Sequence, residues 1–234
     1  MSFYDPIAGI YDPWSRSVTE DVEFYVDEAL ASGGPVVELA VGTGRVAVPI
    51  AEAGVSVIGV DLSEGMLDVA RGYARERGVE RLVDLRHGDL RDPPVRERVP
   101  LVICPFRSLL HMAGPDEKLA ALQAAHDVLE PEGRFIFDVF APSREDIEET
   151  DGRWLEREPG IFERADWDEP ERTLTLSVRS DDVATSFTLH WLSDAEWRDL
   201  IAAAGFGVDE LWGWFDRRPY EGGEDMIFSC RRPG

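Results

Sequence analysis

Two glycines and an aspartate in the first third of the chain have the spacing of a nucleotide-binding site. Gly42 and Gly44 close the segment Glu38-Leu39-Ala40-Val41-Gly42-Thr43-Gly44, which joins a predicted strand to a predicted helix. Glycine lets the backbone come close to a ligand and direct amide N–H groups at it. Asp61 ends the next predicted strand, where a carboxylate can accept hydrogen bonds from ribose hydroxyls. The segment also fits the dinucleotide pattern as Gly42-x-Gly44-x-x-Ala47, and such a match alone leaves a structural turn open.

Strands and helices that alternate along the chain place this loop at the edge of a sheet. Short apolar runs between turn residues predict strands, and apolar positions at helical spacing predict helices. Strands are predicted at 36–40, 55–60, 82–86, 101–104 and 134–140, and helices at 17–31, 45–53, 63–77 and 116–129. A Ser17/Glu20 capping box is expected to start the first helix. This alternation predicts a doubly wound α/β fold with a mostly parallel sheet.

The pattern changes after about residue 150. Alternation of polar and apolar residues predicts antiparallel strands at 173–178 and 186–191, with a weaker match at 162–167. A Ser193/Glu196 capping box then introduces a helix at 194–204, and strands follow at 208–215 and 226–231. Residues 1–234 are therefore expected to form one domain with a seven-stranded sheet and a small antiparallel β insertion at 150–192.

Composition excludes several classes of partner. The formal net charge of −23 would repel a nucleic-acid backbone or an anionic membrane surface, so neither is expected as a partner. No apolar run approaches roughly 18 residues and no secretory signal is visible, so a cytoplasmic location is expected. Cys104 and Cys230 are expected as buried free thiols. No Cys/His cluster has metal-ligand spacing, so no metal is predicted, and no pattern fixes the oligomeric state.

Four segments, taken in their order along the chain, carry a resemblance to a known family. They are the glycine motif Glu38-x-Ala40-x-Gly42-x-Gly44, the segment Val57–Leu67 around Asp61, His87-Gly88-Asp89-Leu90-Arg91-Asp92, and Leu129-Glu130-Pro131-Glu132-Gly133-Arg134. Together they resemble the class I S-adenosylmethionine-dependent methyltransferases, which have a Rossmann-like fold, over nearly the whole chain. Ala40 departs from the family pattern, in which glycine is commoner at that position.

The resemblance implies which residues would bind S-adenosylmethionine. The backbone of the glycine motif would meet the methionine part, Asp61 would hold the ribose, and Asp89 would receive the adenine amino group. An N-terminal segment, 1–16, would cover the cofactor through a tyrosine near Tyr11, with a plain hydrophobic anchor as the alternative. The implied cofactor-binding residues are Tyr11, Glu38, Ala40, Gly42, Gly44, Asp61, Leu62, Met66, Asp89, Leu90 and Cys104.

The predicted transfer site follows the fourth strand, where Cys104-Pro105-Phe106-Arg107-Ser108-Leu109-Leu110-His111 resembles the segment beside the transferred methyl group. His111 is the candidate base or acceptor-orienting group, with a structural hydrogen bond as the alternative. Phe106 and Arg107 are candidate acceptor contacts, Arg107 through an acceptor carboxylate or else in a surface salt bridge. His190 and Trp191 on the insertion are further candidates. Six of the seven tryptophans lie between 154 and 214, where they would line a pocket or form the insertion's own core.

The expected function is in-line transfer of a methyl group to a nitrogen or oxygen of a small molecule, with the insertion as a substrate lid. Positioning and exclusion of water can supply most of the catalysis, because the sulfonium donor is already reactive. A non-catalytic S-adenosylmethionine-binding protein and a nicotinamide-dependent oxidoreductase are the alternatives.

The amide content of the chain predicts its thermal behaviour. The sequence has no asparagine, one glutamine (Gln123) and one lysine (Lys118), and scarcity of thermolabile amides is a thermophile trait. We expect a calorimetric melting temperature above the mesophile range of about 45–65 °C. Melting inside that range in ordinary buffer would assign the composition to coding bias or salt adaptation.

Overall fold

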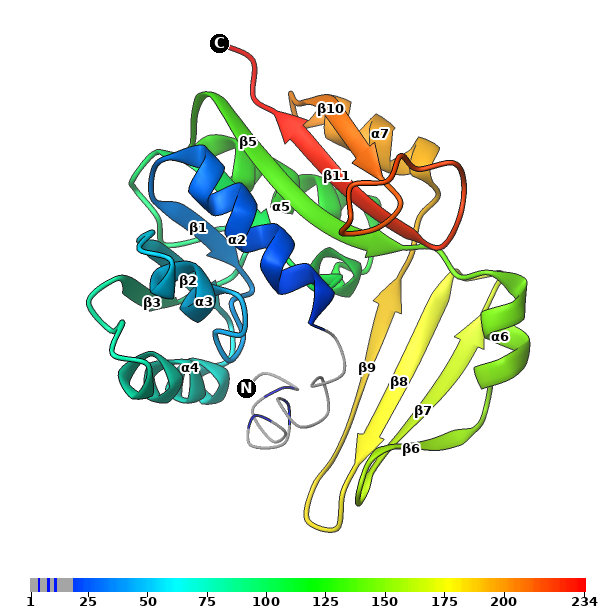
Figure 1. Cartoon of the computed structure of the whole chain (residues 1–234). Helices are drawn as coiled ribbons and strands as arrows, with labels where there is room; N and C mark the ends of the chain where they lie inside the picture. Colours follow the sequence, from blue (N-terminus) through cyan, green and yellow to red (C-terminus); the bar gives the residue numbers. More distant parts are fainter. Residues whose placement is uncertain (1–3, 5–7, 9–10, 12–18) are drawn as a thin grey trace.

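Residues 19–140 form the alternating strands and helices that the sequence predicts (Figure 1). The computed structural model describes Tyr4, Ala8, Tyr11 and residues 19–234. The first five strands are β1 (Val36–Leu39), β2 (Val57–Asp61), β3 (Val83–His87), β4 (Val99–Cys104) and β5 (Leu129–Phe140). The helices are α2 (Glu20–Ser32), α3 (Ala47–Glu52), α4 (Glu64–Glu76) and α5 (Pro115–Val128), and a 3-10 helix, η2 (Ser108–His111), follows β4.

These strands belong to a seven-stranded sheet with the order β10-β11-β5-β4-β1-β2-β3. Its remaining strands are β10 (Gly207–Trp212) and β11 (Asp225–Arg231), preceded by α7 (Asp194–Ala203). Among the described strands of this sheet, β11 runs in the opposite direction to all the others and pairs antiparallel with β10 and β5. The predicted α/β fold, with a doubly wound and mostly parallel seven-stranded sheet, is confirmed. The carboxyl ends of β1 to β5 consequently meet at one edge, where ligands bind in such folds.

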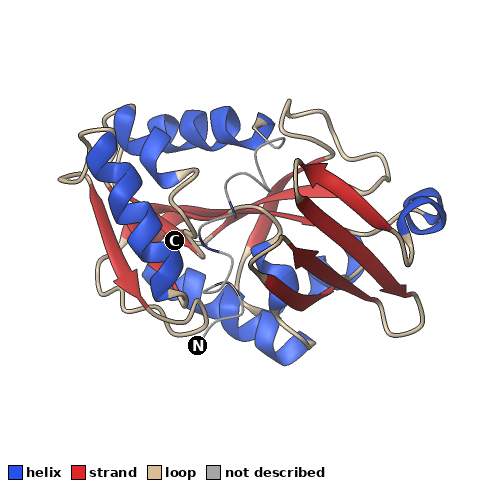
Figure 2. Cartoon of the chain, turned by 90° about the horizontal axis from the view of Figure 1, so that it is seen from below, coloured by secondary structure: helices blue, strands red, loops and turns tan. Residues whose placement is uncertain are grey.

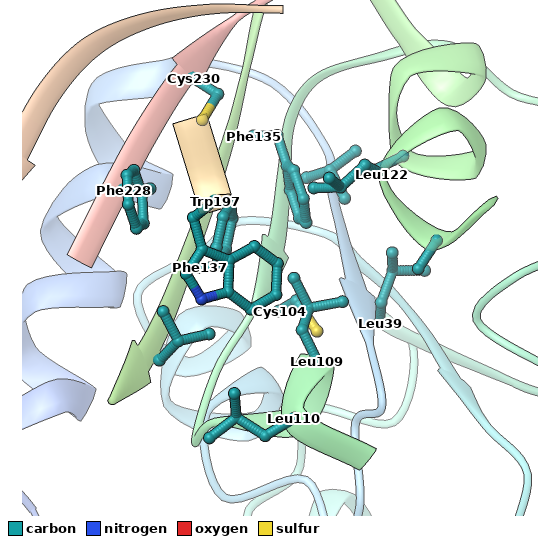
Figure 3. Close-up of a cluster of buried hydrophobic side chains, with 14 of the residues drawn as sticks. Leu39, Cys104, Leu109, Leu110, Leu122, Phe135, Phe137, Trp197, Phe228 and Cys230 are labelled. Atoms are coloured by element: carbon teal, nitrogen blue, oxygen red, sulfur yellow. The ribbon is translucent and has the colours of Figure 1, made fainter. Parts of the chain in front are cut away.

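Helices cover both faces of the large sheet (Figure 2). Helices α2, α3 and α4 pack on one face through side chains such as Phe24, Ile50 and Leu67. Helices α5 and α7 pack on the other, where the Trp197 ring lies 5.5 Å from Phe137 (Figure 3). Cys104 and Cys230 lie in this second cluster as free, buried thiols. Burial on both faces explains why the strands read as unbroken apolar runs.

A second sheet of four antiparallel strands follows β5 and the short helix α6 (Arg144–Thr150). Its strands are β6 (Trp154–Glu158), β7 (Ile161–Asp168), β8 (Thr173–Arg179) and β9 (Ala184–His190). Figure 1 shows this sheet on the side towards which β1 and β5 point, with the C terminus at the other end of the molecule. Its apolar face, which includes Leu174 and Phe187, joins the core cluster on the α5 side of the large sheet.

The sequence predicts three of these four strands and misses β6. That strand reads Trp154-Leu155-Glu156-Arg157-Glu158, and its register with β7 shifts between Glu156 and Glu158. The shift interrupts the two-residue period, and charged side chains are typical of an exposed edge strand. Helix α6 is also missed, although Ser143 and Asp146 form a capping box at its start.

The predicted helix boundaries are right at α7 and wrong at α2. Ser193 and Glu196 form the expected capping box of α7. Helix α2 instead begins at Glu20, after Thr19, which makes no side-chain cap; Ser17 lies outside the described residues. The strand expected at 208–215 ends at Trp212, because the Gly213 N–H donates to the Arg218 carbonyl and turns the chain.

No helix in the described part of the chain is both long and apolar enough to cross a bilayer.

Candidate active site

The loop after β1 is built on three left-handed residues. Ala40, Gly42 and Gly44 have φ values of 58°, 55° and 82°. A Cβ on Gly42 would have no described atom within 4 Å, whereas one on Gly44 would meet Ala70 and Val48 at 3.3 Å. Gly42 thus leaves open space above the backbone, and Gly44 allows close packing of the loop on α4 and α3. Ala40 takes the same conformation with a side chain, at a cost of about 1–2 kcal/mol.

Asp61, at the end of β2, ties this loop to the start of α4. Its Oδ2 accepts the Gly42 N–H at 2.8 Å and its Oδ1 accepts the Ser63 N–H at 2.8 Å. Leu62, the next residue, is 54% exposed and is one of three exposed large apolar side chains in the described part of the chain. Met66 lies buried one turn into α4. A half-buried carboxylate next to an uncovered leucine is a suitable surface for a ligand with polar and apolar faces.

Beneath the loop lies a buried carboxyl group, Glu38 on β1. Its Oε2 makes no hydrogen bond to any described residue, and burial raises its pKa well above the usual range. Nearby, the Arg45 guanidinium forms a bidentate pair with Asp21 of α2 at 2.7 and 2.6 Å, and it lies 4.7 Å above the Phe106 ring. Arg45 therefore joins the glycine loop, α2 and the end of β4.

Asp89 follows β3 at the same edge, since Gly88 donates its N–H to the Asp61 carbonyl at 2.9 Å. Its carboxylate accepts the Arg91 side chain at 2.9 and 2.6 Å and the Arg91 N–H at 2.9 Å, and these bonds lower its pKa. Leu90 beside it packs half-buried against the core. A ligand that donates to Asp89 must share this carboxylate with Arg91.

The turn after β4 is strained and is held by a carboxylate that the sequence analysis does not single out. Phe106 and Arg107 both have left-handed backbones, with φ values of 58° and 62°, a cost of roughly 1–3 kcal/mol each. Asp138 of β5 accepts both N–H groups, at 2.8 Å on Oδ1 and 2.9 Å on Oδ2, and its Oδ1 also accepts the Tyr25 hydroxyl at 2.6 Å. Successive N–H groups around an anion form a backbone nest. The sequence feature that could have identified Asp138 is the presence of a carboxylate inside the apolar run Phe135–Phe140.

His111, at the end of η2, contacts the N-terminal Tyr4. The Tyr4 hydroxyl and His111 Nε2 are 3.0 Å apart, and the Phe187 ring lies 5.3 Å from each of their rings. Burial, followed by the charge of Lys118 and the proximity of His190, lowers the pKa of His111 to about 4. The imidazole is therefore neutral at pH 7. Burial, Tyr11 and Asp61 raise the pKa of Tyr4, so Tyr4 keeps its proton.

A cavity of about 540 Å³, hereafter the large cavity, opens between this edge and the small sheet. Phe106, Arg107 and His111, three candidates from the segment after β4, line it. His190 and Trp191 are not among the described residues that line it. Trp191 packs against Trp167 at 5.5 Å instead. The other apolar lining residues are Phe140, Pro142, Leu155, Ala165, Trp167, Leu174, Leu176, Phe187, Leu189, Trp214 and Phe215.

Acidic side chains dominate the polar lining of the large cavity. The arginines that line it are already paired: Arg107 with Asp225 at 2.8 Å, and Arg157 with Glu163 at 2.7 Å. Arg107 also lies 4.8 Å above the Phe140 ring. Arg107 therefore forms a salt bridge within the protein, which was the alternative to its binding an acceptor carboxylate. The acidic lining residues are Glu20, Asp21, Asp138, Asp146, Glu163, Glu224 and Asp225.

The tryptophans of residues 154–214 line the large cavity in part, as one of the two alternatives expects, but those in the core pack on the large sheet and its helices and do not form a separate core of the insertion. Trp167 and Trp214 line the large cavity. Trp197 is fully buried in the core, and Trp212 packs on Phe24 at 5.5 Å. Trp154 is partly exposed beneath the Arg179 guanidinium, 4.1 Å from it. Aromatic residues in this region thus serve both the cavity and the core.

Comparison with known proteins agrees with this arrangement. Residues 36–133 match the family described as Methyltransferase domain. The CcbJ methyltransferase from Streptomyces caelestis is 27% identical, with a TM-score of 0.84 over 100% of this chain and 99% of that one. CalS10 from Micromonospora echinaspora, an amino pentose methyltransferase solved with S-adenosylmethionine bound, is 21% identical, with a TM-score of 0.64 over 93% of each chain.

A curated relative covers only part of the chain. The ubiquinone biosynthesis O-methyltransferase of Ruegeria pomeroyi is 32% identical over 44% of this chain and 39% of its own length. This chain thus spans less than half of that relative. Such matches favour a methyltransferase over the nicotinamide-dependent alternative. Motif order, full-length fold and family match agree, and the chain belongs to the class I S-adenosylmethionine-dependent methyltransferases.

Proposed function

We propose that the chain methylates a small molecule bound in the large cavity, and that the acceptor atom is an amine nitrogen. One observation carries the proposal: the cavity begins where the cofactor loop ends. Phe106 lines the cavity and also lies beneath Arg45 of the glycine loop. Tyr4 lines the cavity and lies close enough to Asp61 for that charge to raise its pKa. Donor and acceptor sites on either side of these two rings would be in direct reach of each other.

The residues of the loops after β1, β2 and β3 fit S-adenosylmethionine. The orphaned carboxyl oxygen of Glu38, the open space above Gly42 and the uncovered Leu62 are each features that a bound ligand would satisfy. When bound, S-adenosylmethionine supplies a methyl group on a sulfonium. We assign the loop backbone to its methionine part, Asp61 to the ribose, and Met66, Leu62, Leu90 and Asp89 to the adenine. Tyr11 and Cys104 would flank the cofactor on the cavity side.

The charge of the large cavity supports an amine acceptor. Seven carboxylates line it, and three of them pair with a guanidinium: Asp225 with Arg107, Glu163 with Arg157 and Asp21 with Arg45. A cavity with negative walls concentrates cations and repels carboxylates. Aromatic walls such as Trp167 and Trp214 also favour an ammonium group over an anion. This balance argues against the acceptor carboxylate considered for Arg107.

The Tyr4–His111 pair is suited to orient such an amine once the amine is neutral. A protonated amine has no lone pair, so it must lose a proton before it can attack a methyl group. Neutral His111 can accept the Tyr4 hydroxyl hydrogen on Nε2 in the tautomer protonated on Nδ1. The phenol oxygen then presents its lone pairs to an amine N–H in the cavity. The amine would release its proton to water or to a lining carboxylate, because burial and the low pKa of His111 keep that imidazole neutral.

The insertion at 150–192 is proposed as the lid of this site. Strands β7, β8 and β9 supply Ala165, Leu174 and Phe187 to the cavity wall. The large sheet supplies the opposite wall through Asp138 and Phe140. Cofactor and acceptor would thus be held by different parts of one domain.

Substitutions at Asp61 test the cofactor assignment. Asp61→Asn and Asp61→Ala should each weaken S-adenosylhomocysteine binding by about tenfold or more, since charge-assisted hydrogen bonds to the ribose are lost. Because the carboxylate also accepts two backbone N–H groups, the alanine variant should lose about 1–3 kcal/mol of stability in urea unfolding as well. Binding is measured by titration calorimetry, with exposed Asp68→Asn as the control. Wild-type affinity in both variants would remove Asp61 from the site.

A matched set of acceptors tests the amine assignment. Phenylpropylamine, phenylpropanol and phenylpropionate share one skeleton, and release of S-adenosylhomocysteine is followed for each. We expect turnover of the amine alone. Glu224→Gln should raise the KM for the amine several-fold, since it removes one lining charge, whereas Glu221→Gln in the same loop should not. Turnover of the alcohol or acid, with the amine inert, would contradict the assignment while leaving the methyltransferase activity intact.

Single and double variants test this hydrogen-bonded pair. With phenylpropylamine, His111→Ala and Tyr4→Phe should each lower kcat by roughly 10²-fold, because a misplaced acceptor costs about that factor. The double variant should be no slower than the worse single variant, because both residues orient the amine through one line of hydrogen bonds. His126→Ala on α5 is the control. Losses of only a few-fold, or fully multiplicative losses, would leave His111 with a structural role.

A further inference from the structure

The turn of Phe106 and Arg107 forms part of both sites. The Phe106 ring lies beneath Arg45 and 6.4 Å from Tyr11, on the side of the cofactor loop. Arg107 follows directly, and its guanidinium lies over Phe140 and pairs with Asp225 in the large cavity. A change in the backbone of this turn would move both walls at once. Whatever fixes its conformation therefore fixes the boundary between donor and acceptor.

The group that fixes it is a single carboxylate. Both N–H groups of the turn donate to Asp138, one to each oxygen, and the described chain places Tyr25 as its other donor. Two consecutive non-glycine residues in the left-handed region need such support, because short-range sterics disfavour that conformation. We propose that Asp138 is a positioning residue, whose carboxylate holds Phe106 and Arg107 in the left-handed conformation in which they separate the cofactor from the acceptor. The proposal rests on the proposed function for its acceptor side only.

The protonation behaviour of Asp138 argues against a purely stabilising role. Burial raises its pKa to about 6, although the Tyr25 hydroxyl, Arg107 and the Phe106 N–H oppose the shift. An acid with a raised pKa in the folded state binds its proton more tightly there, so its contribution to stability is present below its ordinary pKa and lost as pH rises through about 6. At neutral pH the charged form therefore costs stability. What the charge provides is an acceptor for each N–H group of the turn.

Other ionisable groups face Asp138, and their effects on the pH dependence must be distinguished from its own in any test. From α2 these are Tyr25 and Asp21, and from β4 and its turn Cys104 and Arg107. Arg45 lies within range, and Glu38 on β1 acts on Cys104 from the same side. Burial also raises the pKa of Glu38. A pH effect in this region thus belongs to Asp138 only if it disappears when Asp138 is replaced.

The experiment measures S-adenosylhomocysteine affinity from pH 5 to 8 by titration calorimetry, in the full-length protein. Wild-type affinity should fall about tenfold as the pH is lowered through about 6, because protonation removes one acceptor from the turn. Asp138→Asn, which keeps the size but offers an NH2 group to one N–H, should have the weakened affinity at every pH. Asp127→Asn on the exposed side of α5 should follow the wild-type curve.

A second variant gives a change that a structural role would not produce. Tyr25→Phe removes a hydrogen bond that lowers the Asp138 pKa, so the midpoint of the affinity curve should move to higher pH. In each of the two proteins, the amide resonances of Phe106 and Arg107 should titrate with the midpoint of that protein's own affinity curve. Glycine tolerates the left-handed region, so Asp138→Asn should cause a smaller loss in an Arg107→Gly background than in the wild type.

Each outcome decides the proposal. A folded Asp138→Asn protein with the wild-type curve, or one that keeps the pH dependence, would overturn it, the latter in favour of Glu38. If that variant does not fold, an unshifted midpoint in Tyr25→Phe overturns it instead. Wild-type protein that binds no S-adenosylhomocysteine at any pH would refute the cofactor assignment, while the amide titration would still report on the turn. Loss of phenylpropylamine turnover with normal affinity curves would concern the proposed acceptor alone.

Discussion

The site depends on carboxylates that reach from one strand to the loop of its neighbour. Parallel strands end at a common edge, and the N–H groups of the loops that leave them have no partners in the sheet. Asp61 on β2 accepts the Gly42 N–H from the loop after β1, and Asp138 on β5 accepts Phe106 and Arg107 from the turn after β4. The pairs β1–β2 and β4–β5 are adjacent in the sheet. In both cases the carboxylate satisfies left-handed residues that would otherwise have unpaired donors.

Electrostatics then separate the two ligand sites. Around the glycine loop two of the carboxylates have arginine partners, since Arg45 pairs with Asp21 and Arg91 with Asp89. In the large cavity the arginines are paired and carboxylates remain in excess. A chain with a net charge of −23 already attracts cations at long range, and the cavity focuses that field on one place. Neutral His111 sits at the inner wall, where burial prevents it from adding a positive charge.

The sequence predicts well those features that depend on neighbours along the chain. The glycine loop, Asp61 at a strand end and the Ser193 capping box all have local signals, and each lies where expected. The small sheet was predicted except for β6, whose charged sequence and register shift hide its period. The family resemblance added the cofactor, which spacing alone left open. Trp191 was assigned to the acceptor because it lies on the insertion, but its ring packs against Trp167.

The features that the sequence does not predict are long-range pairs. Asp138 lies 113 residues from Tyr25 and 32 from Phe106, and Tyr4 lies 107 residues from His111. No periodicity reports which of 47 acidic residues will meet which donor, so Asp138 could be noticed only as a carboxylate in an apolar strand.

The strained residues of the edge explain why these pairs are needed. Glycine at 106 and 107 would take the left-handed conformation without steric cost, as Gly42 and Gly44 do. It would also leave no ring beneath Arg45 and no guanidinium over Phe140. A side chain at such a position is compatible with a single stable conformation only if another interaction offsets the backbone strain. The buried carboxylate of Asp138 provides that interaction, at some loss of stability at neutral pH. The backbone strain at Phe106 and Arg107, the carboxylate that offsets it and the loss of stability at neutral pH thus have one cause. Each follows from placing two functional side chains on a turn whose conformation favours glycine.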